Sequence, residues 1–267
     1  MSNPYLALTA EFNAGRLRAL LSSGQAVVVH RLAIASKDGD WIIREDSEST
    51  DHVRKVLAAH GAQYRFGAPL DPRWTAGGWS CHFEFRADEL RIRTDFVSRP
   101  PRVSPPLLAS MWREAEASGT DVVGIEPLAA IKLTDREKDY AIVGELARRM
   151  PDPGAQFRWS RSSRDLISLA AAHPDALRDE LSMRPLLALI PQGRDALDEA
   201  LDRERRALMR ANEERLAGYR AAAAPWASIW PDVQREIAGK SLADAHAIVC
   251  ARADGVLPFA PPSGVRP

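Results

Sequence analysis

Two neighbouring segments with a two-residue rhythm constrain the fold more than any other feature of this sequence. Residues 78–86 (GWSCHFEFR) and 89–97 (ELRIRTDFV) alternate apolar and polar side chains, and only Ala87 and Asp88 separate them. Successive side chains of a strand point to opposite faces, so this rhythm predicts an antiparallel hairpin with one apolar and one polar face. The polar face of the first strand would carry three side chains: His82, Glu84 and Arg86.

A proline-rich segment separates this hairpin from the rest of the chain. Residues 97–109 (VSRPPRVSPPLLA) cannot continue a helix or a central strand, because proline fixes φ and lacks a backbone donor. Beyond them the composition becomes helical. Residues 126–133 and 139–150 predict two short helices, and a stripe of leucines predicts a long helix from about Gly193 to Ala223.

The sequence therefore predicts an α+β protein of two domains. Its length of 267 residues suits two modest domains. We expect residues 1–110 to form a mixed sheet with flanking helices, and residues 111–267 to form a mainly helical domain for substrate binding or interaction.

Residues 1–60 offer four further elements. A helix is expected to start near Thr9 and to run to Leu21, because its apolar residues fall on one face. The β-branched run AVVVH at residues 26–30 predicts a buried strand, and DWII at residues 40–43 predicts a second one. A helix follows at residues 50–60.

Composition excludes several classes of protein. The 36 basic and 36 acidic side chains cancel, so no global field attracts nucleic acid or an anionic membrane. The two cysteines, Cys81 and Cys250, lie far apart without the paired spacing of a zinc site, and we expect two inert thiols in a reducing compartment. The chain begins without a signal-like segment and holds no apolar stretch of bilayer length, so we expect a soluble, cytoplasmic protein with no membrane partner.

The sharpest local feature is the triplet Asp38-Gly39-Asp40 directly before an apolar run. In an extended segment both carboxylates project from one face, and two clustered anions repel each other unless a cation lies between them. Magnesium prefers such hard oxygen ligands and usually keeps water and substrate phosphates as well, which favours a triphosphate site. Most Asp-x-Asp pairs are nevertheless solvated turns or caps.

A third carboxylate would complete a two-metal site. Asp95 is the best candidate, since it lies in the polar register of the second hairpin strand with Arg91 and Arg93. Two metal ions about 3.5 to 4 Å apart stabilise the attacking and leaving oxygens of an in-line displacement at phosphorus. Such a site would carry out phosphoryl or nucleotidyl transfer.

Residues 23–43 (SGQAVVVHRLAIASKDGDWII) resemble the first motif of the minimal and abortive-infection-type bacterial nucleotidyltransferases. That motif is a Gly-Gly or Gly-Ser pair, a buried strand ending in His-Gly, and Arg-x-Thr-x-Asp-x-Asp before an apolar run. The matching residues are Gly24, Ala26, His30, Ser36, Lys37, Asp38 and Asp40.

A second block, residues 124–147, resembles the helical segment that follows in the same family. The residues that match its pattern in order are Glu126, Leu128, Lys132, Lys138 and Asp139. The resemblance covers about the first 150 residues. It departs from the family at Ser23, which replaces the first glycine, at Arg31, which replaces the glycine after histidine, and at Ile34, which replaces arginine.

The resemblance implies a nucleotidyltransferase-like fold and a magnesium-dependent enzyme. Such an enzyme moves a nucleoside monophosphate from a nucleoside triphosphate to a hydroxyl acceptor on RNA, protein or a small molecule. It implies metal binding by Asp38, Asp40 and Asp95, with Asp95 also activating the acceptor. It implies triphosphate binding by four residues: Ser23, Gly24, Lys37 and Lys132.

Two alternatives stay open. The departures at Arg31 and Ile34 are compatible with a catalytically degenerate nucleotide-binding or interaction module. Some relatives are toxins of toxin–antitoxin pairs, so an antitoxin is a candidate partner. In the plainest alternative the acidic residues are exposed turns of a structural protein.

Overall fold

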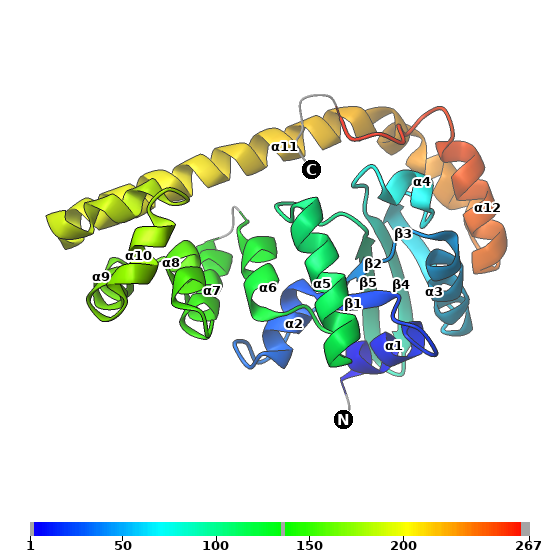
Figure 1. The fold of residues 1–267 in the computed structure, drawn as a ribbon. Helices are drawn as coiled ribbons and strands as arrows, with labels where there is room; N and C mark the ends of the chain where they lie inside the picture. The colour runs from blue at the N-terminus through cyan, green and yellow to red at the C-terminus, as the bar shows by residue number, and fades with distance from the viewer. Residues whose placement is uncertain (1–2, 135–136, 263–267) are drawn as a thin grey trace. The chain divides into compact units, whose positions relative to one another are not determined.

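The fold combines a five-stranded mixed sheet, flanking helices and a long helical region, as expected for an α+β protein (Figure 1). The computed structural model describes residues 3–134 and 137–262, apart from the side chains of residues 137 and 138. Contacts divide the chain into two compact units: unit 1 comprises residues 1–123 and 215–267, and unit 2 comprises residues 124–214. The domain boundary expected at residues 110 and 111 falls inside helix α5 of unit 1.

Unit 1 contains the sheet and a large hydrophobic core. Its elements are α1 (Pro4–Phe12), β1 (Ala19–Ser22), α2 (Ser23–Val29), β2 (Gly39–Ile43), α3 (Ser47–Ala59), β3 (Gln63–Gly67), α4 (Pro72–Thr75), β4 (Cys81–Ala87), β5 (Leu90–Val97), α5 (Pro105–Ser118) and α12 (Leu242–Ala253). The end of α11 (Arg194–Ile237) also belongs to it. The strand order is β1-β2-β5-β4-β3, with β2 parallel to β5 and the other pairs antiparallel.

The predicted hairpin is confirmed as β4 and β5. The two strands pair antiparallel from Cys81 opposite Phe96 to Ala87 opposite Leu90, and buried positions alternate with more exposed ones. On the buried face Trp41 of β2 stacks on Phe96 with ring centroids 5.4 Å apart. The ring of Phe12 from α1 meets Trp41 edge-on, which closes this part of the core.

The helix expected from Thr9 to Leu21 ends at Phe12, and this prediction is wrong beyond that residue. Asn13 explains the break, because its side-chain oxygen accepts hydrogen bonds from the backbone N–H of Arg18 and of Ala19. These bonds turn the chain, and residues 19–22 then enter the sheet as β1.

The strand expected at residues 26–30 is also wrong, because residues 23–29 form helix α2. The position beside β2 is already filled by β1, which pairs with it from Ala19 opposite Ile43 to Ser22 opposite Asp40. The β-branched run instead buries Ala26 and Val27 on one side of a short helix. Tertiary packing here overrides β propensity. The other two predictions hold, since residues 40–43 lie in β2 and residues 50–59 lie in α3.

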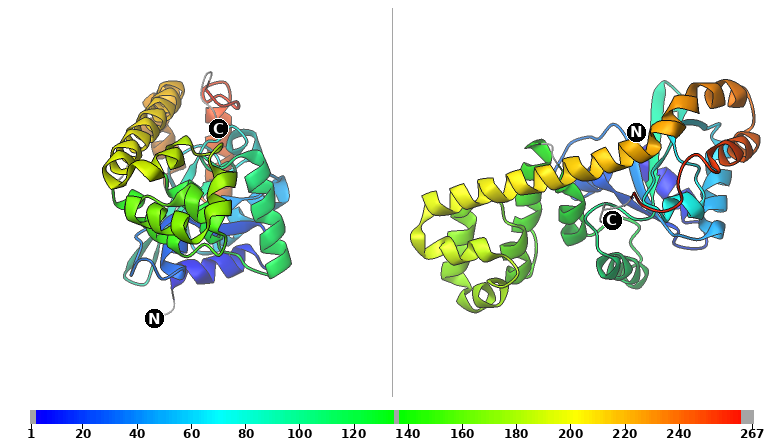
Figure 2. Two further views of the ribbon diagram at one scale, coloured as in Figure 1. Left: turned by 60° about the vertical axis from the view of Figure 1, so that its left-hand side comes forward. Right: turned by 90° about the horizontal axis from the view of Figure 1, so that it is seen from above.

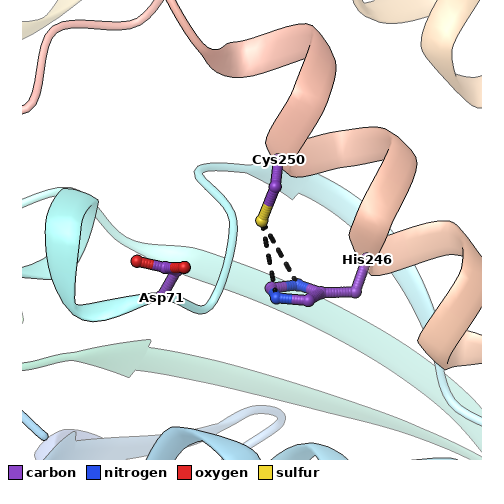
Figure 3. A group of neighbouring side chains, drawn as sticks. All are labelled: Asp71, His246 and Cys250. Carbon is purple, nitrogen blue, oxygen red and sulfur yellow. Dashed lines mark hydrogen bonds between the residues drawn. The ribbon is translucent and has the colours of Figure 1, made fainter. Parts of the chain in front are cut away.

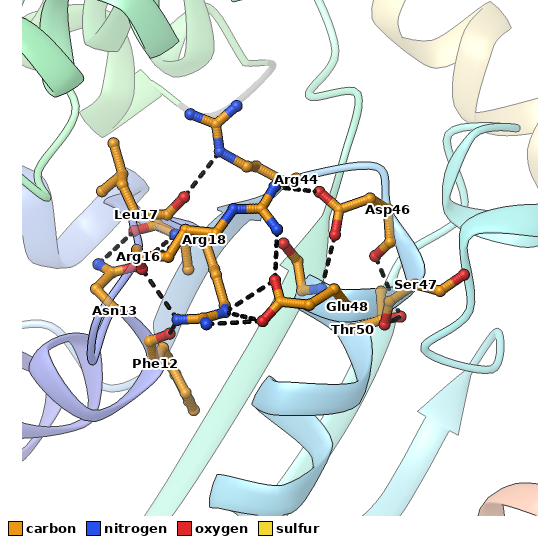
Figure 4. Close-up of polar contacts among 12 residues, drawn as sticks. Phe12, Asn13, Arg16, Leu17, Arg18, Arg44, Asp46, Ser47, Glu48 and Thr50 are labelled. Carbon is orange, nitrogen blue, oxygen red and sulfur yellow. Dashed lines mark hydrogen bonds and ion pairs between the residues drawn. The ribbon is translucent and has the colours of Figure 1, made fainter.

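A buried arginine fastens the turn after α1 to the start of α3 (Figure 4). Arg18 is 7% exposed, and its guanidinium donates to the carboxylate of Glu48 and to the backbone oxygens of Phe12, Ala14 and Arg16. Asp46 caps α3 by accepting a hydrogen bond of 2.7 Å from the N–H of Ser49.

Helix α12 completes unit 1 by packing beside α3, as Figures 1 and 2 both show. After α12 the chain is fastened to the region around α4. The indole nitrogen of Trp74 donates to the backbone oxygen of Leu257 at 3.0 Å, and that of Trp79 donates to the backbone oxygen of Pro258 at 2.7 Å. The core also takes in Trp226 near the end of α11.

Unit 2 is helical. It holds α6 (Ile125–Lys132), α7 (Glu137–Arg148), α8 (Pro153–Trp159), α9 (Ser163–Ala172), α10 (Pro174–Glu180), the 3-10 helix η1 (Pro185–Gln192) and the first part of α11. Helices α6 and α7 confirm the two predicted short helices, and α11 confirms the long one, with a later end than expected. Nowhere in the described residues does a helix combine the length and the apolar character needed to cross a bilayer.

Candidate active site

A row of polar side chains crosses the sheet of unit 1 at the level of Asp40. The parallel pairing of β2 and β5 places Asp40 opposite Asp95. Neighbouring strands lie about 4.8 Å apart, so in-register side chains leave the same face of the sheet next to each other. The row extends to Ser22 on β1 and to His82 on β4. Two residues 55 positions apart in the sequence are thereby brought together.

Gly39 accounts for the glycine between the two aspartates. Its Cα faces the core, where an added Cβ would lie 2.4 Å from the ring of Trp41 and 2.5 Å from the ring of Tyr5. Both aromatic side chains are buried. Only glycine fits at this point of β2. Core packing therefore explains the glycine of the Asp-Gly-Asp triplet.

Asp95 already has two basic neighbours. Its Oδ1 accepts a hydrogen bond of 3.0 Å from the guanidinium of Arg65 and lies 2.8 Å from Nδ1 of His82. Arg65 reaches it from β3, where the pairing with β4 is irregular between Tyr64 and Phe66. The carboxylate of Asp95 is therefore held toward the β3–β4 side of the row.

His82 links Asp95 to a hydroxyl group. Its Nε2 lies 2.7 Å from Oγ of Ser80, and the ring of Phe66 stacks on the imidazole with centroids 4.0 Å apart. The Nδ1 contact with Asp95 is close but has no hydrogen-bond geometry. An imidazole that lies between a carboxylate and a hydroxyl is placed to act as a general base, which takes the proton of a hydroxyl.

Asp38 lies just before β2 and has one unsatisfied oxygen. Its Oδ1 is buried and accepts no hydrogen bond among the described residues, and the nearest cationic group is the guanidinium of Arg93 at 3.7 Å. Beside it the hydroxyl of Tyr5 donates to the backbone oxygen of Lys37 at 2.7 Å. Burial raises the pKa of Tyr5, and the negative charge of Asp38 raises it further.

The structure brings Asp40 and Asp95 together but does not gather all three carboxylates tightly. In the described part of the chain, the carboxylate oxygens of Asp38, Asp40 and Asp95 do not form a group within 4.8 Å of one another. Asp95 is paired with Arg65 and His82, and Asp38 faces Arg93. Basic side chains thus lie beside both Asp38 and Asp95 in this structure.

Ser23 and Gly24, the expected phosphate-binding pair, directly follow β1. Ser23 adopts a left-handed φ of 48°, and a Cβ on Gly24 would lie 2.2 Å from Oγ of Ser36. Contact with Ser36 is therefore one reason for glycine here. The side chain of Lys37, the third expected phosphate-binding residue of unit 1, is exposed.

Two of the residues that depart from the resembled motif, Arg31 and Ile34, lie in the loop between α2 and β2. Arg31 has a left-handed φ of 58°, a conformation that glycine adopts without strain and other residues rarely adopt. Ile34 is fully exposed. Before this loop, Nε2 of His30 lies 2.8 Å from the backbone oxygen of Val123, a structural contact.

Lys132, the fourth expected triphosphate-binding residue, belongs to unit 2. Its ammonium is buried and lies 3.3 Å from Oδ1 of Asp139, whose other oxygen accepts a hydrogen bond from Thr134. The pair neutralises charge inside unit 2. The side chain of Lys138 lies outside the described residues.

Sequence reasoning missed three residues that contact the acidic row: Arg65, His82 and Arg93. His82 and Arg93 stand in the polar register of the predicted hairpin, so their position was visible in the sequence although their contacts were not. Arg65 gave no such signal, because β3 was not predicted as a strand.

No family model and no curated protein matches this chain. Among solved structures it is similar to a candidate nucleotidyltransferase from Helicobacter pylori, with 13% identity, a TM-score of 0.37, and coverage of 80% of this chain and 98% of the other. It is also similar to JHP933 from Helicobacter pylori, with 13% identity, a TM-score of 0.35, and coverage of 83% and 98%. Both TM-scores lie below 0.5, so the functional assignment depends on the residues of the site.

Proposed function

We propose that this protein is a magnesium-dependent nucleotidyltransferase that moves a nucleoside monophosphate from a nucleoside triphosphate to a hydroxyl acceptor. The observation that carries the proposal is the in-register placement of Asp40 beside Asp95 on the parallel strands β2 and β5. Asp38 precedes the same strand by one residue. The resemblance of residues 23–43 to the nucleotidyltransferase motif points to the same chemistry.

The acidic row offers oxygen ligands to a divalent cation, although its carboxylates would have to move closer together to share one. The buried Oδ1 of Asp38, which accepts no hydrogen bond among the described residues, is a hard oxygen of the kind that magnesium binds. Asp38, Asp40 and Asp95 would hold the metal, which when bound supplies positive charge to the triphosphate. Arg65 would have to release Asp95, since its guanidinium now lies 3.0 Å from that carboxylate.

The other residues of the site are assigned to substrate. Ser23 and Gly24 would approach the phosphates at the end of β1, where Ser22 lies opposite Asp40. Lys37 would add a positive charge. Asp95 and His82 would accept the proton of the acceptor hydroxyl. The helical unit 2 would supply the surface that selects the acceptor, RNA or protein, in the cytoplasm.

The test uses labelled nucleoside triphosphates with and without magnesium chloride. Asp38→Ala and Asp40→Ala are each expected to abolish label transfer, to the chain itself or to added RNA or protein. Glu89→Ala is the matched control, because Glu89 is an exposed acid in the hairpin turn of the same sheet. Transfer that survives both aspartate substitutions would overturn the proposal.

The pairing of Asp95 with Arg65 and His82 favours a second candidate function, a nucleotide-binding or interaction module without catalysis. An antitoxin would be a partner of such a module or of the active enzyme. Calorimetric titration with ATP separates the two functions when it is combined with the transfer assay. ATP binding that needs Asp40, together with no transfer to any acceptor in the native chain and in Arg65→Ala, would favour the module.

A further inference from the structure

A cluster of three metal-ligating side chains lies in unit 1 outside the acidic row (Figure 3). Asp71 is the N-cap of α4, and His246 and Cys250 project from α12. Because His246 and Cys250 are four residues apart on a helix, they share one face a turn apart. One ligand atom from each of the three residues lies within 4.8 Å of the other two.

The distance between the two helical ligands matches a shared metal ion. Nε2 of His246 and Sγ of Cys250 are 3.4 Å apart. In a tetrahedral zinc site with a Zn–N bond of about 2.0 Å and a Zn–S bond of about 2.3 Å, the nitrogen and sulfur lie about 3.5 Å apart. Sγ also lies 3.9 Å from Nδ1, so the thiol sits over the face of the ring. To bind one ion together with His246, the thiol must move from the ring face toward the in-plane lone pair of Nε2.

The opposite edge of the imidazole is already fixed. Nδ1 of His246 lies 2.8 Å from the hydroxyl of Tyr64, which also accepts a hydrogen bond of 3.1 Å from the N–H of Leu70. Either tautomer of His246 satisfies this contact, and the one that donates Nδ1–H to Tyr64 leaves Nε2 with a lone pair for a metal ion. A metal-bound histidine is held in this way by an oxygen acceptor behind it.

We propose that Asp71, His246 and Cys250 form a zinc-binding site whose fourth position is open to water. Sulfur and imidazole donors favour zinc over magnesium or calcium, which select oxygen. The site is distinct from the proposed magnesium site, because the three ligands belong to other elements: the β3–α4 connection and α12. Bound zinc would join α12 to the sheet region of unit 1.

Zinc binding would have to remove the proton of the Cys250 thiol. Burial and the nearby Arg54 lower the pKa of His246 to about 4, so the imidazole is neutral and available as a ligand at pH 7. Burial and the charge of Asp71 raise the pKa of Cys250 to about 11, so the free thiol is protonated. On binding, the S–H bond breaks, a Zn–S bond forms, and one proton passes to the buffer.

Arg73 competes for the carboxylate of Asp71. Its guanidinium donates to Asp71 through Nε at 3.0 Å and through a terminal nitrogen at 2.9 Å. The Arg73 side chain is half exposed, so it can leave without opening the core. Removal of its charge should strengthen metal binding, so Arg73→Ala is expected to gain affinity for zinc.

The same three residue types can also form a nucleophilic cysteine site, but the contacts argue against it. His246 makes its Nδ1 contact with Tyr64, so the ring is oriented by a phenol rather than by the carboxylate of Asp71. The raised pKa of Cys250 and the lowered pKa of His246 disfavour the thiolate–imidazolium pair that such a nucleophile needs.

Titration of the full chain with cobalt chloride and zinc chloride tests the proposal. Cobalt is expected to produce a thiolate charge-transfer band that zinc abolishes at one equivalent. Calorimetry with zinc chloride in two buffers of different ionisation enthalpy should report about one proton released per ion.

Variants then assign the ligands. Cys250→Ser should remove the cobalt band, whereas Cys81→Ala, at the other cysteine, should keep it. Asp71→Asn and His246→Gln should weaken zinc binding by more than about 100-fold, because loss of an outer-shell partner alone costs about 10 to 100-fold. Arg73→Ala should tighten zinc binding.

Circular dichroism of each variant identifies any that do not fold. If a ligand variant does not fold, the cobalt band of the native chain and the zinc affinity of Arg73→Ala still test the proposal. No cobalt band in the native chain, or a band that persists in Cys250→Ser, would overturn the proposal. The contact between His246 and Cys250 would then be a hydrogen bond without a metal role.

Discussion

At the scale of single residues, the position of the acidic row depends on the packing of Gly39 against the core. Gly39 leaves room for the rings of Trp41 and Tyr5, which an added Cβ would approach to 2.4 and 2.5 Å. Neither buried ring can move freely, so alanine at this position must push β2 away from the core. The positions of Asp38 and Asp40 would shift with the strand.

Gly39→Ala is therefore expected to destabilise the protein by about 1 to 3 kcal/mol, the usual cost of overpacking a core. Gly144→Ala is the matched control, because Gly144 lies inside α7 and an added Cβ would find its nearest atom at 3.9 Å. Alanine there should stabilise the helix by up to about 1 kcal/mol. Urea denaturation measures both, and equal stability of Gly39→Ala and the native chain would contradict the packing argument.

The sequence predicted part of the site because strand alternation determines which side chains share a face. Asp40 and Asp95 both followed from their polar registers, and the parallel pairing of β2 and β5 places them opposite each other. The contacts of Asp95 did not follow. Arg65 reaches it across an irregular β3–β4 pairing, and a one-residue irregularity of this kind leaves no periodic trace in the sequence.

At the scale of elements, the N-terminus of α3 is stabilised by a charge network that depends on pH. Desolvation raises the pKa of Asp46, but hydrogen bonds from Ser49 and the charge of Arg16 outweigh it and hold this pKa below 3.8. A carboxyl whose pKa is lower in the folded state stabilises the fold above its unfolded pKa and loses that contribution as pH falls.

We therefore expect the free energy of unfolding to fall as the pH drops below about 4, through the lowered pKa of Asp46. Asp46→Asn keeps a capping side chain but removes the charge, so its stability should decline less steeply over the same range. Urea denaturation at a series of pH values between about 6 and 3 measures the two slopes. Parallel curves would show that Asp46 does not contribute to acid sensitivity.

The elements were predictable where one pattern excluded the others. The hairpin of β4 and β5 followed from a long alternation, and α3 followed from helical spacing. The run AVVVH at residues 26–30 did not distinguish a buried strand from a buried helix. This run forms a helix because β1 occupies the place beside β2. The sequence did not reveal β1, because most of its residues were assigned to the first helix.

At the scale of the whole molecule, the two proposed metal sites can be separated by stability measurements. Both lie in unit 1, and each ligand that binds only the folded chain stabilises it by RT ln(1 + [L]/Kd). At a free ligand concentration about 100 times Kd, the stabilisation is about 2.7 kcal/mol. Zinc and magnesium–ATP should each raise the melting temperature of the native chain.

The variants should divide these effects. Asp40→Ala is expected to lose the stabilisation by magnesium–ATP and to keep that by zinc, whereas Cys250→Ser should show the reverse. Thermal unfolding with each ligand measures all four combinations, and the chelator EDTA should reverse both shifts. If one substitution removed both shifts, the two ligands would share a site, and the separate assignment of Asp71, His246 and Cys250 would be wrong. If both substitutions instead removed the stabilisation by zinc while neither removed the stabilisation by magnesium–ATP, that result would show that β2 and α12 are energetically coupled.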